Sequence, residues 1–172
     1  ELPGPVTARK GPGFLWIEWG AARHPLEVRL QVPGEVQLPG SELAIEARRM
    51  TGGRGAPGSE WICLAWKALR PPLTVRTRRA GDRLTTAAPK GPGTRTYKLK
   101  ELVGRMDIPR WQRDRLVVLA DRDGLVWVAG LGPAERARPH PTTDEFLCLR
   151  FKRARAEALG EGRRCHPFLS MI

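Results

Sequence analysis

Frequent proline and glycine residues are the feature that most limits how this chain can fold. Its 172 residues include 19 Gly and 16 Pro, and these two residue types end helices and shape turns. Between them lie short segments in which apolar and polar residues alternate, as at 26–32 and 73–78. Alternation with a period of two is typical of a β-strand with one buried face. We therefore predict an α+β fold, mostly antiparallel β, in which small sheets pack together like a sandwich.

Turn signals and apolar segments place the individual strands. Asp123-Gly124 lies between two segments rich in β-branched residues and predicts a tight hairpin. The predicted strands cover residues 14–19, 26–32, 43–47, 60–66, 73–78, 116–120, 125–129 and 145–151.

One segment has the periodicity of a helix, which we place at about 96–107. Leu99, Leu102, Val103 and Met106 recur at positions i, i+3, i+4 and i+7 and form one apolar stripe. Pro109 ends the helix because the residue before a proline is pushed out of the helical region. The same proline is suited to begin a short helical turn over 109–115.

Composition divides the chain into three predicted parts. Residues 1–69 form a β-rich first part, 70–152 a basic second part, and 153–172 a basic tail that we expect to be partly disordered. The chain begins Glu1-Leu-Pro-Gly without an initiator Met, so we expect it to be cut from a longer protein. No apolar run approaches the roughly 20 residues that cross a bilayer, which excludes a membrane span.

Positive charge is concentrated between Arg70 and Arg115. This segment holds thirteen Lys and Arg against four acids, a net charge of +9 within the +12 of the whole chain. Residues 1–69 have a net charge of only +1, and 116–149 of −2. A localised field of this kind attracts polyanions, of which the phosphate backbone of a nucleic acid is the commonest.

The type and position of these cations favour contact with a phosphate backbone. Most are Arg, whose planar guanidinium binds phosphate with two hydrogen bonds. Tyr97 and Trp111 are the only aromatic residues among them, so recognition of backbone and shape fits better than stacking on single-stranded bases. The predicted phosphate contacts are Arg76, Arg78, Arg83, Lys98, Lys100, Arg105, Arg110, Arg113 and Arg115.

The sequence shows no catalytic or metal site. His24, His140 and His166 lie in proline-flanked segments without a nucleophile beside them, and no glycine-rich phosphate loop is present. Asp121 and Asp123 are better explained by the hairpin turn than as paired catalytic carboxylates.

The three cysteines, Cys63, Cys148 and Cys165, form no CxxC motif. We predict that Cys63 and Cys148 are small buried residues, and that Cys165-His166 is too few ligands for a zinc site. Unpaired reduced thiols indicate the cytosol.

A series of motifs then connects the basic segment with a known family. These motifs are Leu73-Thr-Val-Arg76, Gly81-Asp82-Arg83, Gly91-Pro-Gly93, Tyr97-Lys98-Leu99-Lys100, Ile108-Pro109, Arg113-Asp114-Arg115 and Trp127-Val-Ala-Gly130. In this order and spacing they resemble the C-terminal domain of the tRNA(Ile)-lysidine synthetase family. The resemblance covers most of residues 14–152 and is strongest at 73–130.

The resemblance implies a fold of small packed sheets and a helix, shared with a domain of the phenylalanyl-tRNA synthetase β chain. It also implies a bacterial, cytoplasmic parent enzyme, a ligase that uses ATP, Mg²⁺ and lysine to convert the wobble cytidine of a minor isoleucine tRNA to lysidine. That chemistry belongs to an N-terminal domain with a Ser-Gly-Gly-x-Asp-Ser loop, which this chain lacks. This region is therefore expected to be non-catalytic and without a cofactor.

Two positions depart from the family pattern. Tyr97 stands where the family usually has the first Lys of the helix, so one phosphate contact is missing there. Val117 replaces a proline before the following strand. Gly81, Asp82, Pro109, Trp127 and Gly130 are assigned to the fold, with Asp82 a possible partner of an Arg.

The resemblance implies two partners, a minor isoleucine tRNA and the catalytic N-terminal domain of the same polypeptide. In the first hypothesis residues 70–152 hold the tRNA backbone, and the family points to the acceptor stem. In the alternative hypothesis the chain is an interaction module that docks on the catalytic domain, and its arginines engage acids of that domain.

Overall fold

The computed structural model of the protein describes residues 26–38, 43–52, 58, 60–89, 91–106, 108 and 113–153, and the backbone of 6–11 and 14–19. The two N-terminal segments pair as an antiparallel hairpin of β1 (Val6–Gly11) and β2 (Phe14–Trp19). The strand predicted at 14–19 is therefore confirmed.

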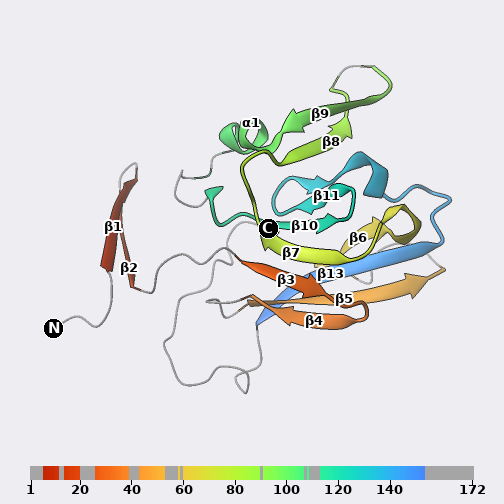
Figure 1. The fold of residues 1–172 in the computed structure, drawn as a ribbon, viewed down its shortest axis with the longest axis horizontal. Helices are drawn as coiled ribbons and strands as arrows, with labels where there is room; N and C mark the ends of the chain where they lie inside the picture. Colours follow the sequence, from red (N-terminus) through yellow and green to blue (C-terminus); the bar gives the residue numbers. More distant parts are fainter. Residues whose placement is uncertain are drawn as a thin grey trace.

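A five-stranded sheet forms one layer of the fold (Figure 1). The strand order is β12-β11-β10-β7-β3, and all neighbouring strands in it are antiparallel. Its strands are β3 (Glu27–Leu30), β7 (Leu73–Thr77), β10 (Val117–Asp121), β11 (Gly124–Val128) and β12 (Gly132–Pro133). The turn between β10 and β11 is the predicted Asp123-Gly124 hairpin.

A four-stranded sheet in the order β4-β5-β13-β6 forms the second layer. Its strands are β4 (Gly34–Gln37), β5 (Leu43–Thr51), β6 (Ile62–Ala65) and β13 (Glu145–Arg153). Strand β13 pairs with β5 along its whole length. Both sheets thus combine strands from before and after residue 69, and a domain boundary at that point stays a prediction.

The main core lies where the two sheets face each other. Val75, Leu119 and Trp127 from the five-stranded sheet join Leu64 and Leu147 from the four-stranded sheet in one cluster of buried side chains. Each of these five is at most 4% exposed. Alternation along the strands places these residues inward, as the period of two predicted.

A hairpin and a short helix form a third unit at the top of Figure 1. Strands β8 (Arg83–Ala87) and β9 (Thr94–Lys98) pair only with each other, and α1 (Leu99–Gly104) follows β9 directly. Leu84, Leu99 and Val103, each 1% exposed, pack with Val118 and Val128 in a second core cluster. Two 3₁₀ turns, η1 (Trp66–Ala68) and η2 (Glu135–Ala137), complete the described elements.

The predicted fold class is confirmed, and the helix is shorter than predicted. Residues 94–98 form a strand because they pair with 83–87, and their Thr and Tyr side chains suit a pleated surface. The predicted apolar stripe is present: Leu99 and Val103 are buried, and Leu102 and Met106 pack against them. Most of the predicted turn at 109–115, including Pro109, lies outside the described residues.

The two described cysteines lie opposite each other on β6 and β13. Cys148 is fully buried and Cys63 is half-buried, and both are free thiols. Burial, together with a hydrogen bond to Cys148, raises the pKa of Cys63 to about 12. The thiol is therefore protonated at neutral pH. Cys165, His24, His166 and the tail from residue 154 lie outside the described residues.

Within the described ranges, no helix is long and apolar enough to cross a membrane, and no three His, Cys, Asp or Glu side chains gather as a metal site.

We predict that Leu99→Ala destabilises the protein by about 2–5 kcal/mol, because the side chain fills the second core cluster and its removal leaves a cavity. Lys100→Ala, one residue further along the same helix, removes an exposed side chain and should change stability by no more than about 0.5 kcal/mol. Urea unfolding of both variants measures the difference. Equal effects would mean that α1 does not face the core as described.

Candidate nucleic-acid interface

A buried ion pair between Arg76 and Asp82 lies within the basic segment. Arg76 projects from β7 and is 9% exposed. Its Nη1 and Nη2 donate to the two carboxylate oxygens of Asp82 over 2.9 and 2.7 Å. The main-chain N–H of Arg79 donates to the same carboxylate over 2.7 Å. Burial raises the pKa of Asp82, but the hydrogen bonds from Arg76 and Arg79 outweigh it and hold the pKa below its usual range.

This ion pair fixes the turn from which β8 begins. The turn includes Gly81, whose φ of 89° is a conformation that side chains other than glycine rarely adopt. The main-chain carbonyl of Asp82 accepts a hydrogen bond from the N–H of Leu99 over 2.8 Å. The start of α1 is thereby tied to the start of β8, and Arg83 lies directly opposite Lys98 across the hairpin.

A second arginine, Arg78, holds the segment that precedes β10. Its main-chain N–H donates to the carbonyl of Leu116 over 2.9 Å, and its Nε donates to that of Arg113 over 2.6 Å. The guanidinium also pairs with Asp114, and the side chain is 19% exposed. Arg113 in turn donates from Nε to the carbonyl of Ile108 over 2.8 Å. The two arginines therefore hold the main chain at Ile108, Arg113 and Leu116.

The exposed cations of the segment lie on the hairpin and the helix. Arg83 begins β8, Lys98 ends β9, Lys100 lies in α1 and Arg105 directly follows it. All four are exposed, and none pairs with a carboxylate of another described residue. Arg115 is exposed as well. We refer to Arg83, Lys98, Lys100 and Arg105 as the cationic face.

Most described cations around the four-stranded sheet have the opposite character, because they lie beside carboxylates. Glu46 is the centre of this network: burial raises its pKa, and the hydrogen bonds from Arg150 and Arg48 outweigh that effect and lower it. Both arginines also lie over the ring of Trp61, at 4.7 and 5.2 Å from its centroid. The ion pairs are Arg48–Glu46, Arg49–Glu145, Lys67–Asp144, Arg150–Glu46 and Lys152–Glu35.

The predicted phosphate contacts therefore divide into groups. Four of the nine are exposed on the hairpin and at the helix, as the cationic face, and Arg115 is also exposed. The guanidinium groups of Arg76 and Arg78 are bonded within the fold, which gives these two residues a structural role instead of an open phosphate contact. Arg113 is half-buried, and Arg110 lies outside the described residues.

Sequence reasoning missed one exposed cation near this face. Arg95 lies on β9, and its guanidinium is 5.1 Å from the ring centroid of Tyr97. A strand at 94–98 places positions 95 and 97 on one side, so the alternation of this segment was the signal that could have indicated the pair.

Two of the residues assigned to the fold, Trp127 and Gly130, have close neighbours. Trp127 is 4% exposed, and its ring lies 5.9 Å from that of Phe151. Gly130 leaves room for Met106, whose Cε would lie 3.0 Å from a Cβ added at that position. A larger residue at 130 would therefore press on the end of the helical segment.

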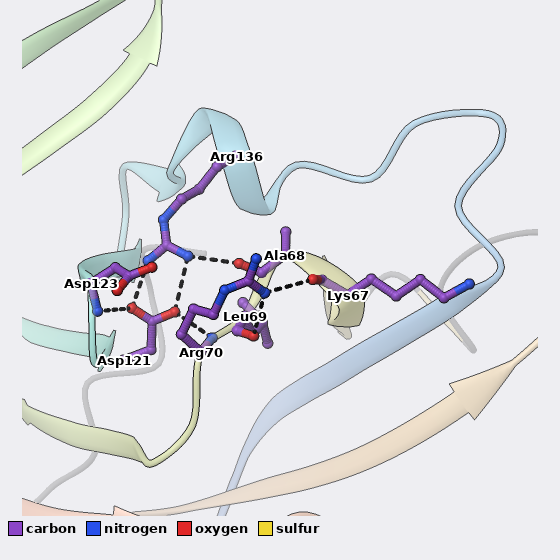
Figure 2. Close-up of polar contacts among 7 residues, drawn as sticks. All are labelled: Lys67, Ala68, Leu69, Arg70, Asp121, Asp123 and Arg136. Carbon is purple, nitrogen blue, oxygen red and sulfur yellow. Dashed lines mark hydrogen bonds and ion pairs between the residues drawn. The ribbon is translucent and has the colours of Figure 1, made fainter.

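The carboxylate of Asp121 has a structural environment, as the hairpin interpretation predicted (Figure 2). It accepts hydrogen bonds from Arg136 over 2.9 and 2.6 Å, from the N–H of Arg70 over 2.8 Å and from the N–H of Asp123 over 2.9 Å. Burial raises its pKa, and these four donors outweigh that effect and lower it. Arg136 also donates to the carbonyl of Ala68 over 2.7 Å. The hydrogen bonds of Asp121 and Arg136 therefore connect η1, η2 and the β10–β11 turn.

Comparison with known proteins gives a consistent match. Residues 73–146 match the family model of the TilS substrate C-terminal domain. The chain is 33% identical over 157 residues to tRNA(Ile)-lysidine synthase of Solibacter usitatus, which covers 87% of this chain and 34% of that protein. Identity to the synthase of Geobacillus kaustophilus is 39% over 103 residues, or 59% of this chain and 21% of that protein. The chain thus spans about a third or less of these curated relatives.

A solved structure, the crystal structure of a TilS C-terminal domain, shares the fold. It superimposes with a TM-score of 0.61 at 30% sequence identity, covering 77% of this chain and 100% of the other.

The Arg76–Asp82 ion pair predicts a pH-dependent effect of Asp82→Asn. Because folding lowers the pKa of Asp82, the stabilisation it provides is complete above the unfolded pKa of about 3.9 and is lost as the pH falls through the lower folded pKa. Removing one partner of a buried pair costs about 3–5 kcal/mol. At pH 7 we expect the free energy of unfolding of the variant to be lower than that of the native protein by this amount. Below about pH 4 the difference between the two free energies should become smaller.

Denaturant unfolding across the pH range measures this difference in the free energy of unfolding. Glu101→Gln is the control, because it changes an exposed acid. A deficit that stays constant down to about pH 2 would contradict the ion-pair account.

Proposed function

The chain belongs to the family of C-terminal domains of tRNA(Ile)-lysidine synthase, and from this premise we propose that it is the non-catalytic tRNA-binding region of such an enzyme. The parent ligase would convert the wobble cytidine of a minor isoleucine tRNA to lysidine in the bacterial cytoplasm. ATP, Mg²⁺ and lysine would be bound by its N-terminal catalytic domain. This region would bind the tRNA and would contribute no catalytic group to the reaction.

The observation that carries this proposal is the contrast between paired and unpaired cations. Around the four-stranded sheet, most described cations lie beside carboxylates, so their positive charge is largely neutralised. On the cationic face none of the four cations forms an ion pair with a carboxylate of a described residue. Like charges placed directly opposite on a hairpin, as Arg83 and Lys98 are, destabilise it in isolation. A polyanion that neutralises them removes that cost.

The proposed contacts are with phosphates of the tRNA backbone. Arg83, Lys98, Lys100, Arg105 and Arg115 would bind phosphates directly, and Arg110 and Arg113 lie on the adjoining segment. Arg76 and Arg78 would act indirectly, by holding the turn and the segment from which these side chains project. The family resemblance points to the acceptor stem as the part of the tRNA that is held.

We predict that the protein binds minor isoleucine tRNA with a steep dependence on salt. Five phosphate contacts correspond to a slope of about −4.5 for log affinity against log salt, or a roughly 500-fold loss between about 50 and 200 mM. Fluorescence anisotropy with labelled tRNA measures the slope. Affinity that does not change with salt would exclude phosphate contact and favour the hypothesis of a module that docks on the catalytic domain.

The double variant Lys98→Ala/Arg105→Ala is expected to weaken tRNA binding and to make the salt slope less steep by about 1.8, since each lost phosphate contact removes about 0.9. Stability should change by no more than about 0.5 kcal/mol because both side chains are exposed.

The matched control is Arg29→Ala/Arg153→Ala, which removes the same charge from exposed positions of β3 and β13. Those strands lie in the lower half of Figure 1, away from the hairpin and α1. If both pairs weaken binding equally, net charge alone governs the affinity, and the assignment to the cationic face is wrong.

A further inference from the structure

The hairpin β8–β9 has a second set of exposed polar groups beside its two cations. Leu84 is 1% exposed and packs in the second core cluster, so the side of the hairpin that carries it faces the protein. Alternation and register place six residues on the opposite side, which we call the outer face. These residues are Arg83 with Lys98, Thr85 with Thr96, and Ala87 with Thr94.

The hydroxyl groups of Thr85 and Thr96 are bonded to each other across the outer face. Their Oγ1 atoms are 2.7 Å apart, and either can be the donor. One hydroxyl hydrogen is used in this contact, so the pair retains one donor and several lone pairs. Neither hydroxyl forms a hydrogen bond with any other described residue. The pair can therefore both donate and accept toward a ligand.

The outer face also has a shape that limits the ligand. Beyond Arg83 and Lys98 at its base, its side chains are three Thr and one Ala, so the surface has low relief. It has no acid and no aromatic side chain; Tyr97 lies on the other side, beside Arg95. Single-stranded nucleic acid is normally held by stacking on aromatic rings, which this face lacks. Double-helical RNA instead presents a wide, shallow minor groove lined with ribose 2′-hydroxyls.

We propose that the outer face of the β8–β9 hairpin lies in the minor groove of an RNA duplex and that the Thr85–Thr96 pair bonds ribose 2′-hydroxyls there. Arg83 and Lys98 then contact the phosphates at the edge of the same groove. A 2′-hydroxyl is both a donor and an acceptor, which matches the unused capacity of the threonine pair. This inference rests on the proposed tRNA-binding function and adds to it a means of distinguishing RNA from DNA.

The test compares two acceptor-stem minihelices of the same sequence, one with ordinary ribose and one with 2′-fluoro ribose in the stem. The fluoro form keeps the A-type helix and lacks the hydroxyl donor. We expect the native protein to bind the fluoro form roughly tenfold more weakly, the equivalent of one or two hydrogen bonds. Thr85→Val/Thr96→Val should bind both minihelices equally, at the native affinity for the fluoro form. Valine keeps the shape and suits a strand.

Thr86→Val is the matched control, because it removes a hydroxyl from the other face of the same strand, where that group bonds the carbonyl of Ala87. It should retain the native preference for ribose. Melting temperatures of all variants establish that the hairpin is intact.

Equal native affinity for the two minihelices, or a valine variant that still prefers ribose, overturns the 2′-hydroxyl contact. If intact tRNA is nevertheless bound with a steep salt dependence, the proposed function stands and only this inference fails. If neither intact tRNA nor either minihelix is bound, both fail together.

Discussion

The ion pair between Arg76 and Asp82 is the interaction on which the geometry of the basic segment depends. It joins the five-stranded sheet to the turn at 79–82, and the carbonyl of Asp82 then holds the first residue of α1. A buried ion pair contributes little net stability, because desolvation offsets attraction, but the loss of one partner is costly. Its role here is therefore one of position: it sets where β8 and α1 begin, and so where Arg83, Lys98 and Lys100 lie.

The cations of the basic segment have two different roles in this chain. Where a guanidinium is largely enclosed, as in Arg76 and Arg78, it bonds carboxylates and carbonyls of the fold and fixes the main chain of the segments around it. The exposed cations of the cationic face form no ion pair with a described acid. Enclosed arginines organise the scaffold, and the exposed cations on that scaffold generate the field that would attract a phosphate backbone.

Local patterns predicted much of the fold but not the partners of individual side chains. The strand at 73–77, the Asp123-Gly124 hairpin and the apolar stripe of α1 follow from periodicity and turn chemistry, which are local properties. Residues 96–98 belong to strand β9 and not to the predicted helix, because their pairing with residues 83–85 forms only in the folded hairpin. Likewise, the charge pattern predicted that Arg76 would contact phosphate. Its burial against Asp82 could not be predicted, because it depends on a turn and a sheet that form together.

Amide hydrogen exchange of the intact chain, with and without minor isoleucine tRNA at low salt, tests most directly whether the hairpin and helix form the RNA-binding surface. The account predicts that tRNA slows exchange across β8, β9 and α1, while β5 and β13 of the four-stranded sheet exchange as in the free protein. Slower exchange confined to the four-stranded sheet, with the hairpin and helix unchanged, would contradict it.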